Sequence, residues 1–231
     1  MKRGLVIAID GVVGAGKSTV ARSVASTLGY RHLDTGAMYR AVALSASRQG
    51  ITPSDTDPLQ KLLDGMRLDL EPEGQGGRIR LDGEDVSDVI RSPDVSRVVG
   101  SYADIPAVRQ ALVQQQQAIG AAGGVVAEGR DMTSVVFPQA DLKVYMIADL
   151  DERTQRRYRE FADKGVDITV EQVRTDIEQR DQEDAVRDYG GEHASNFVEV
   201  DTSNFVEVDT TGLSAAEVSA QIISLAQQRG A

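Results

Sequence analysis

The sequence predicts an α/β fold with a central parallel sheet flanked by helices, an inserted small antiparallel unit and a short helical lid. Three observations lead to this expectation. Short apolar runs alternate with helical patterns along most of the chain, which is typical of strands in a parallel sheet. Residues 60–91 break the alternation, and an arginine-rich helical segment begins at Asp151. We therefore expect a core of residues 1–59 and 92–231, with the lid at about 151–190, and an insert at residues 60–91.

The first expected element is a buried strand at residues 5–9, LVIAI, because a short apolar run suits a strand covered on both faces. Val20, Val24 and Leu28 then lie four residues apart on one face of a helix. Gly29 is expected to end that helix. Three later stretches have strand character and each accompanies a helical segment. They are VVAEG from Val125, LKVYMIA from Leu142 and NFVEVD near the end of the chain.

The insert contains two short alternating runs, RLDL and RIRL, separated by Gly-rich and Asp-Gly turns. This pattern predicts a small antiparallel sheet outside the parallel core. Two helices are expected after it, with Pro93 and Pro106 near their first positions. The last helix is expected to follow Ser214, because Ser214 and Glu217 have capping-box spacing ahead of apolar positions.

A perfect tandem repeat, SNFVEVDT, occupies residues 195–202 and again residues 203–210. The repeat is too short and has too few copies for a solenoid, so we interpret it as a local duplication. A connection from a strand to a helix usually spans about 2 to 6 residues. We therefore place the core strand at residues 205–208 and expect the first copy to be a loop.

Composition and charge exclude several classes of protein. The chain of 231 residues has no cysteine, which excludes a disulfide framework and a thiol nucleophile and fits a reducing cytoplasm. The apolar run behind the N-terminus ends at Asp10 and is too short for a signal peptide or a membrane span. The net charge of -11 argues against a nucleic-acid partner. We expect a soluble cytoplasmic monomer without a membrane partner, in which clustered arginines meet any phosphorylated ligand.

Residues 11–18 satisfy the phosphate-binding motif G-x-x-x-x-G-K-[ST], between an apolar strand and a helix. Glycines let the loop wrap around phosphates with its N–H groups pointing inward. Lys17 is expected to reach the β and γ phosphates, and Ser18 to hold Mg²⁺. We expect MgATP as the donor, although the motif does not separate ATP from GTP. The expected ATP-binding residues are Gly11, Val12, Val13, Gly14, Ala15, Gly16, Lys17, Ser18 and Thr19.

A phosphate-binding loop occurs in nucleotide switches, in ATPase machines and in kinases. A guanine-nucleotide switch normally carries an N-K-x-D motif, and the only asparagines here, Asn196 and Asn204, are each followed by Phe. Motor and transporter ATPases usually need longer chains. The sequence therefore favours a standalone P-loop kinase that passes phosphate to a small acceptor.

Three arginines are placed to bind a phosphorylated acceptor. Arg40 lies in a helix expected to begin near Gly36, Arg130 follows a buried strand at its carboxyl end, and Arg187 follows in an arginine-rich region. Guanidinium groups bind phosphate in a bidentate manner and keep their charge. Three converging arginines would suit a dianionic monophosphate.

Three further stretches carry a resemblance to a known family: DTGAMYR from Asp34, EGRDM from Glu128 with VVFP after it, and RDQEDAVR from Arg180. Together with the P-loop they resemble the bacterial-type cytidylate kinases, which are nucleoside monophosphate kinases. The resemblance covers nearly the whole chain, since LDGEDVSDVIR is similar to the substrate-binding sheet of that family. It implies transfer of the γ-phosphoryl group of MgATP to CMP or dCMP.

The resemblance also implies roles for individual residues. The implied acceptor contacts are Thr35, Arg40, Arg130 and Arg187 for the phosphate, Ser101, Arg109 and Asp131 for the base, and Arg180 and Asp184 for the ribose. A carboxylate at Asp131 would accept from the amino group of cytosine and repel the carbonyl of uracil. Two other roles stay open for Asp131: it caps the following turn, or it acts on Mg²⁺ through water.

The segment DERTQRRYREFADKG places Arg153, Arg156, Arg157 and Arg159 on the lid helix, and Arg153 and Arg157 share one face of it. In kinases of this kind a mobile lid with arginines closes over the triphosphate, and we expect at least one of them to meet the transferred phosphate. The alternative is a surface helix held by ion pairs. The expected catalytic residues are Lys17, Arg130, Arg157 and Arg187.

Two stretches depart from the family pattern. Thr133 and Ser134 stand where the family commonly has a glycine-led pair, and DYGGEHASNF replaces a proline-containing segment after Arg187. His32 and His193 lack the spacing of metal ligands. The alternative functions are a kinase for another small acceptor, such as UMP, AMP or shikimate, and a nucleotide-dependent interaction module.

Overall fold

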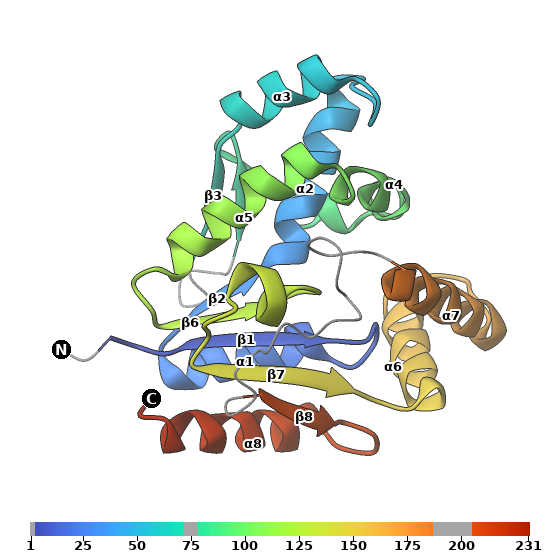
Figure 1. Ribbon diagram of the computed structural model, residues 1–231. Coiled ribbons are helices and arrows are strands. Elements are labelled where there is room, and N and C mark those ends of the chain that lie inside the picture. Colours follow the sequence, from blue (N-terminus) through green and yellow to red (C-terminus); the bar gives the residue numbers. More distant parts are fainter. Residues whose placement is uncertain (1–2, 72–77, 187–204) are drawn as a thin grey trace.

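A five-stranded parallel sheet forms the centre of the computed structural model, which describes residues 3–71, 78–186 and 205–231 (Figure 1). The strand order is β2-β6-β1-β7-β8, and every pairing within this sheet is parallel. The strands are β1 (Val6–Gly11), β2 (Arg31–Asp34), β6 (Val125–Glu128), β7 (Leu142–Ile147) and β8 (Phe205–Asp209). The predicted parallel sheet is thereby confirmed.

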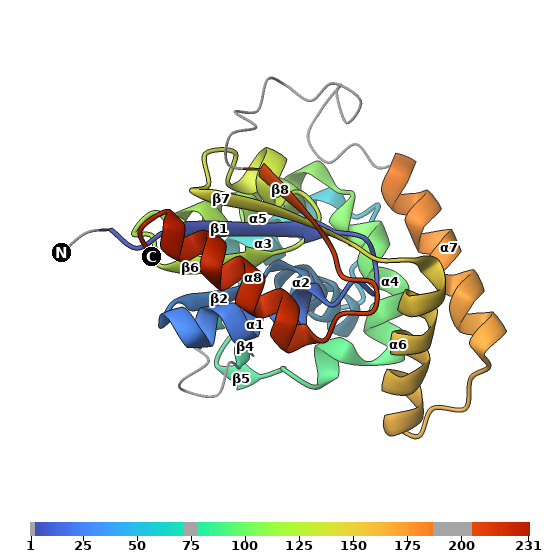
Figure 2. The same cartoon turned by 90° about the horizontal axis from the view of Figure 1, so that it is seen from below.

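Strand β1 lies in the middle of the sheet and is buried along its whole length, as its apolar sequence predicts. Its side chains alternate between two cores. Val6 and Ala8 face a core built with helices α2 and α5, whereas Ile7 and Ile9 face a core built with α1 and α8. Figures 1 and 2 show these helices on opposite faces of the sheet. The helices are α1 (Lys17–Leu28), α2 (Thr35–Arg48), α5 (Pro106–Gly120) and α8 (Ala215–Gln228).

Helix boundaries follow the signals in the sequence. Helix α1 ends at Gly29, whose φ of 67° lies in the left-handed region. Helices α4 (Pro93–Ala103) and α5 each begin with proline. Helix α8 has the complete capping box of Ser214 and Glu217. These predictions are confirmed.

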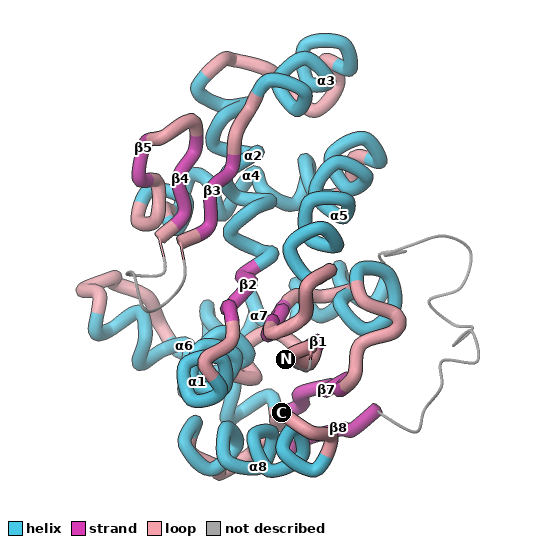
Figure 3. Tube along the Cα trace, turned by 90° about the vertical axis from the view of Figure 1, so that its left-hand side faces the viewer, coloured by secondary structure: helices cyan, strands magenta, loops and turns pink. Residues whose placement is uncertain are grey.

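The predicted antiparallel unit is present as three short strands, β3 (Leu68–Leu70), β4 (Ile79–Leu81) and β5 (Glu84–Asp85). Figure 3 shows this small sheet apart from the central sheet and next to α2. Asp82 and Gly83 connect β4 to β5 with φ values of 52° and 88°, the left-handed pair that a tight hairpin turn requires.

Helix α3 (Thr56–Gly65) was not expected, and it covers the first residues of the predicted insert. Its apolar side chains Leu59, Leu62 and Leu63 are buried in the core shared with α2 and α5. Strand β2 was also not expected, because its sequence RHLD is largely polar. It lies at the edge of the central sheet, where a strand tolerates polar side chains.

The segment predicted to be the lid consists of α6 (Leu150–Asp163) and α7 (Val170–Val186), which pack together beyond the carboxyl ends of the strands (Figure 1). Strand β8 agrees with the prediction of a core strand at residues 205–208. The first copy of the repeat, residues 195–202, lies outside the described residues. Two short helical turns complete the elements, Val89–Arg91 and Met132–Val136. No helix in the described parts of the chain is long and apolar enough to cross a bilayer.

Candidate active site

The phosphate-binding loop joins β1 to α1 at the carboxyl end of the central strand, where ligands of open α/β sheets bind. Gly11 has a φ of 145°, and a Cβ atom there would lie 2.1 Å from the Met146 carbonyl oxygen. Gly16 has a φ of 91° and stands directly before α1. Only glycine fits such positions without strain, so the loop has the shape that its motif predicts.

Lys17 turns back onto the loop that precedes it. Its Nζ donates to the carbonyl oxygens of Gly11 at 2.7 Å and Val12 at 2.9 Å. Burial lowers the pKa of Lys17 to about 7, and the positive charge of Arg130 acts in the same direction. The carboxylates of Glu128, Asp10 and Asp184 oppose this fall in pKa, and the phosphates of a nucleotide would add further negative charge.

Glu128 ends β6 beside the phosphate-binding loop and hydrogen-bonds to Ser18. It is 5% exposed, and burial raises its pKa to about 7. Its Oε1 atom has no hydrogen-bond partner among the described residues and lies 3.9 Å from His32 Nε2. Glu128 is not among the site residues predicted from the sequence. Its place as an acidic residue at the carboxyl end of an apolar strand could have indicated it.

Four guanidinium groups from different elements meet at the cleft. They belong to Arg40 of α2, Arg130 of the segment after β6, Arg157 of α6 and Arg180 of α7. Burial and the charges of the neighbouring arginines lower the pKa of Arg40 and of Arg180. A group of neighbouring guanidinium cations of this kind is suited to a multiply charged phosphate. Arg187, predicted to join them, lies outside the described residues.

Arg130 connects the phosphate-binding loop to the lid segment. Its Nη1 donates to the Gly11 carbonyl oxygen at 2.9 Å, and its Nε lies 3.3 Å from Asp184 Oδ2 on α7. Arg40 donates from Nη1 to Ser96 Oγ at 2.8 Å. Of the residues predicted to bind the acceptor phosphate and the ribose, Arg130 and Asp184 are thus direct neighbours.

The predicted base-reading residues are partly brought together. Arg109 of α5 forms an ion pair with Asp131, with 2.5 Å between Nη2 and Oδ2. Asp131 is 3% exposed, and burial raises its pKa against the opposing effect of Arg109. Ser101 is exposed on α4, and its hydroxyl group donates to the Val98 carbonyl oxygen of its own helix. Tyr39 faces the Arg109–Asp131 pair, and burial and the charge of Asp131 raise its pKa to about 12.

One open interpretation of Asp131 is wrong, because its side chain makes no capping hydrogen bond to the turn at Met132–Val136. Asp10 accepts the first N–H groups of that turn. The hydroxyl group of Thr35, predicted to contact the acceptor phosphate, already has a partner within the protein. Thr35 is 2% exposed, and its hydroxyl group donates to the Glu128 carbonyl oxygen at 2.8 Å, which joins the start of α2 to the end of β6.

The arginines of α6 have different surroundings. Arg153 is 7% exposed and donates from Nη1 to the Val13 carbonyl oxygen at 3.1 Å and to Asp181 at 2.7 Å. Arg157 stacks 4.6 Å from the centre of the Phe161 ring and pairs with Glu160. Arg153 thus anchors the lid helix, whereas Arg157 faces the other cleft arginines.

Arg156 holds the lid helix to the core. Its Nη2 donates to the carbonyl oxygens of Thr210 at 2.6 Å and Leu213 at 3.2 Å, and its Nη1 donates to Thr210 Oγ1 at 2.9 Å. The same nitrogen lies 3.4 Å from the Ala15 carbonyl oxygen. The sequence assigned no separate role to Arg156, because its partners Thr210, Leu213 and Ala15 lie 54 to 141 residues away along the chain.

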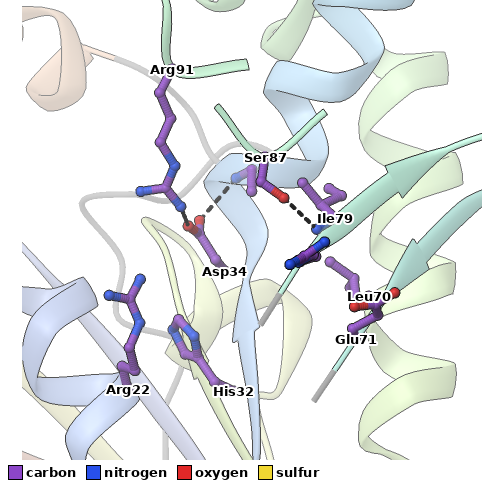
Figure 4. Close-up of a pocket in the computed structure, with 10 residues that line it drawn as sticks. Arg22, His32, Asp34, Leu70, Glu71, Ile79, Ser87 and Arg91 are labelled. Carbon is purple, nitrogen blue, oxygen red and sulfur yellow. Dashed lines mark hydrogen bonds and ion pairs between the residues drawn. The ribbon is translucent and has the colours of Figure 1, made fainter. Parts of the chain in front are cut away.

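A pocket lies between α1, β2 and the small sheet (Figure 4). Figure 4 shows Arg91 directed at Asp34, and the two atoms Nη2 and Oδ2 are 3.2 Å apart. Asp34 also caps α2 through the Ala37 N–H at 2.9 Å. None of the predicted site residues that the structure describes lines this pocket. It is therefore distinct from the arginine cluster.

A sequence profile named Cytidylate kinase matches residues 7–228 of the chain. The chain belongs to the cytidylate kinase family. A cytidylate kinase of Symbiobacterium thermophilum is 49% identical over 184 residues, which cover 79% of this chain and 81% of that protein. One from Solibacter usitatus is 42% identical, with coverage of 97% and 93%. One from Geobacter sulfurreducens is 40% identical, with coverage of 99% and 95%.

Membership of the cytidylate kinase family confirms the resemblance carried by the four motifs. It also confirms the prediction of an ATP-dependent phosphotransferase and speaks against the alternative of an interaction module. Among solved structures, an uncharacterised protein from Eubacterium ventriosum has a TM-score of 0.53 at 14% identity, covering 98% of this chain and 99% of that chain. This likeness concerns the fold alone, and it agrees with the predicted α/β architecture.

Proposed function

We propose that the chain transfers the γ-phosphoryl group of MgATP to CMP or dCMP, giving ADP and CDP or dCDP. The observation that carries the proposal is the convergence of Arg40, Arg130, Arg157 and Arg180 beside Lys17. These cationic groups would counter the negative charge of a triphosphate donor and a monophosphate acceptor. Family membership supports cytidine nucleotides as acceptors.

On the donor side, the backbone N–H groups of residues 11–19 would surround the phosphates of ATP. Lys17 would leave the carbonyl oxygens that now hold it and follow the β and γ oxygens. Ser18 and Glu128 fit a Mg²⁺ ion, because a hydroxyl group and a carboxylate lie together there and Glu128 Oε1 has no hydrogen-bond partner among the described residues. Bound Mg²⁺ would neutralise charge on the transferred phosphate.

On the acceptor side, Arg40, Arg130 and Arg187 would bind the phosphate of CMP, with Thr35 beside it. Arg180 and Asp184 would bind the ribose. Arg130 would then exchange its pairing with Asp184 for the phosphate, and Asp184 would accept hydrogen bonds from the sugar hydroxyl groups. A single bound CMP would thus hold side chains from several separate elements in position for the transfer.

Base recognition is assigned to Asp131, Arg109 and Ser101. The Asp131 carboxylate accepts from the exocyclic amino group of cytosine, and Arg109 holds the carboxylate in position. Uracil would place a carbonyl oxygen against the same carboxylate and be repelled. The Ser101 hydroxyl group would have to leave the Val98 carbonyl oxygen to take part.

The chemistry requires no covalent intermediate and no strong general base, because the attacking oxygen of the acceptor phosphate is already ionised. Lys17, Arg130, Arg157 and Arg187 would stabilise the charge on the transferred group. The lid at about 151–190 would close with the insert at residues 60–91, which we assign to the acceptor, and exclude water as a competing acceptor. We further propose that the enzyme acts as a monomer in the cytoplasm.

The test is a coupled assay of ADP formation with CMP, dCMP, UMP, AMP, GMP or no acceptor, with ATP and then GTP as donor. We expect rapid turnover with CMP and dCMP and slow turnover with the purine monophosphates. Shikimate is included as a further acceptor. ADP formation that does not depend on an acceptor would instead support a nucleotide-dependent interaction module, and preference for AMP or shikimate would reject the assigned base site.

A further inference from the structure

We propose that Asp10 is a positioning residue for base recognition: its carboxylate caps the turn that follows Asp131 and so leaves the Asp131 side chain available to the acceptor. The inference rests on the role of Asp131 under the proposed function. Asp10 would contact neither nucleotide itself. It acts through the segment that carries Arg130 and Asp131.

Asp10 is the second-last residue of β1 and is 2% exposed. Its two carboxylate oxygens accept three hydrogen bonds. Oδ1 accepts from the Met132 N–H at 2.9 Å, and Oδ2 accepts from the Thr133 N–H at 2.8 Å and from Thr133 Oγ1 at 2.7 Å. Burial raises the pKa of Asp10, whereas these donors and the charge of Lys17 oppose that rise. These three donors satisfy the buried carboxylate of Asp10, which acts as a hydrogen-bond acceptor for the turn.

The turn needs such an acceptor, because the first N–H groups of any helical segment have no partner within it. The usual source of a cap is the side chain of the preceding residue, which here is Asp131. Asp131 makes no such bond. Its side chain pairs with Arg109 instead, and its carbonyl oxygen accepts from the N–H groups of Val135 and Val136.

The two buried carboxylates at this loop therefore have different roles: Asp10 accepts from the backbone of the turn, and Asp131 pairs with Arg109. Without Asp10, the N–H groups of Met132 and Thr133 would be left without an acceptor, and a buried donor in that state is costly. The nearest carboxylate in sequence that could accept these hydrogen bonds is that of Asp131. It would then turn away from Arg109 and from the cytosine base of CMP. Because Asp10 also directly precedes the phosphate-binding loop, the end of β1 places both halves of the cleft.

The decisive variant is Asp10→Asn. An amide has only one acceptor oxygen, so its NH₂ group must face either the Met132 N–H or the two Thr133 donors. We expect the KM for CMP to rise about tenfold, and the preference for CMP over UMP to shrink by a similar factor, since one charge-assisted hydrogen bond is lost. The KM for MgATP should change by less than about threefold.

Thr133 provides a milder second variant. Thr133→Val removes the hydroxyl donor and keeps the backbone N–H, so we expect a change of about threefold in the same direction. Thr133→Ser keeps the donor and should restore the wild-type preference. If Asp10→Asn does not fold, the Thr133 pair decides: equal CMP-to-UMP preference in Thr133→Val and wild type would overturn the proposal.

Asp141→Asn is the matched control. Asp141 accepts the Val6 N–H at 2.7 Å at the opposite end of β1, so it also holds backbone with a carboxylate but is remote from the cleft. Its loss should leave the CMP-to-UMP preference unchanged. If Asp10→Asn lowers turnover with CMP and UMP equally, or raises the KM for MgATP alone, Asp10 serves the fold or the donor loop and the proposal is wrong.

Asp131→Asn, measured in parallel, separates this inference from the proposed function. An unchanged CMP-to-UMP preference in Asp131→Asn rejects the base assignment itself. A reduced preference in Asp131→Asn with wild-type preference in Asp10→Asn rejects the role of Asp10 alone.

Discussion

The donor loop and the acceptor side of the cleft are built in opposite ways. Residues 11–18 are contiguous, and the lysine of the loop is held by carbonyl oxygens five and six residues away. The side chains on the acceptor side come from α2, α5, α6, α7 and the segment after β6, and some of them form ion pairs with one another. The ion pairs Arg109–Asp131 and Arg130–Asp184 are examples. A local site is fixed by its own loop, whereas an assembled site depends on the packing of every contributing element.

The largest effect should come from the donor loop. Lys17→Met removes the cation that meets the β and γ oxygens, and we expect kcat to fall by at least about 10²-fold, as when a single group that stabilises the transition state is lost. The fold should be retained. Lys61→Met, at an exposed position on α3, is the control. Near-normal turnover in a folded Lys17→Met enzyme would contradict the assignment of the loop.

On the acceptor side, Asp131→Asn should change selectivity more than turnover. The amide tolerates the carbonyl of uracil and binds cytosine without the help of a charge, so the CMP-to-UMP ratio of kcat/KM should shrink by about 10- to 100-fold. Steady-state kinetics with both acceptors at saturating MgATP measures this ratio. Asp94→Asn, at an exposed position on α4, should leave it unchanged. Equal losses for CMP and UMP would place base selection with Ser101 and Arg109.

The lid helix joins the two sides, and Arg156 tests that connection. Arg156→Ala removes the hydrogen bonds to Thr210 and Leu213, which we expect to cost about 2 kcal/mol of the free energy of unfolding. For a chain of this size that lowers Tm by about 4 to 8 °C. Arg159→Ala on the same helix, where the side chain is exposed, should leave Tm unchanged. Similar Tm values for the two variants would reject the anchoring role.

The smallest effect concerns the stability of the nucleotide-free protein. The pKa of Lys17 falls from 10.5 to about 7 on folding, mainly through burial. Between these values the unfolded state binds more protons, so wild-type stability rises with pH, and the cost of burying the ammonium group is greatest below pH 7. We expect Lys17→Met to raise Tm by about 2 to 4 °C at pH 6 and by less at pH 9.

Thermal unfolding at both pH values measures this difference. An equal gain at pH 6 and pH 9, or a loss at pH 6, would contradict the assigned burial cost. Added MgATP provides an internal check, since it should stabilise the wild-type protein and leave Lys17→Met largely unaffected.

Local patterns were sufficient for much of the architecture. The apolar run of β1, the proline starts of α4 and α5, and the capping box at Ser214 each depend on residues within a few positions of one another. The sequence therefore predicted these elements correctly. It failed at β2 and α3, whose character depends on neighbours: β2 is a polar edge strand, and α3 is held by the core that it shares with α2 and α5.

The sequence by itself determined the phosphate-binding loop, the family and the set of arginines available to the cleft. It did not determine how those groups pair. That Arg153 and Arg156 anchor the lid while Arg157 faces the other cleft arginines depends on carbonyl groups of remote segments. That Asp10 caps the turn after Asp131 depends on the register of β1 against β6, which brings together residues 122 positions apart. Only the packed chain creates such contacts, because hydrogen bonds and ion pairs act over a few ångströms in space and are indifferent to separation along the sequence.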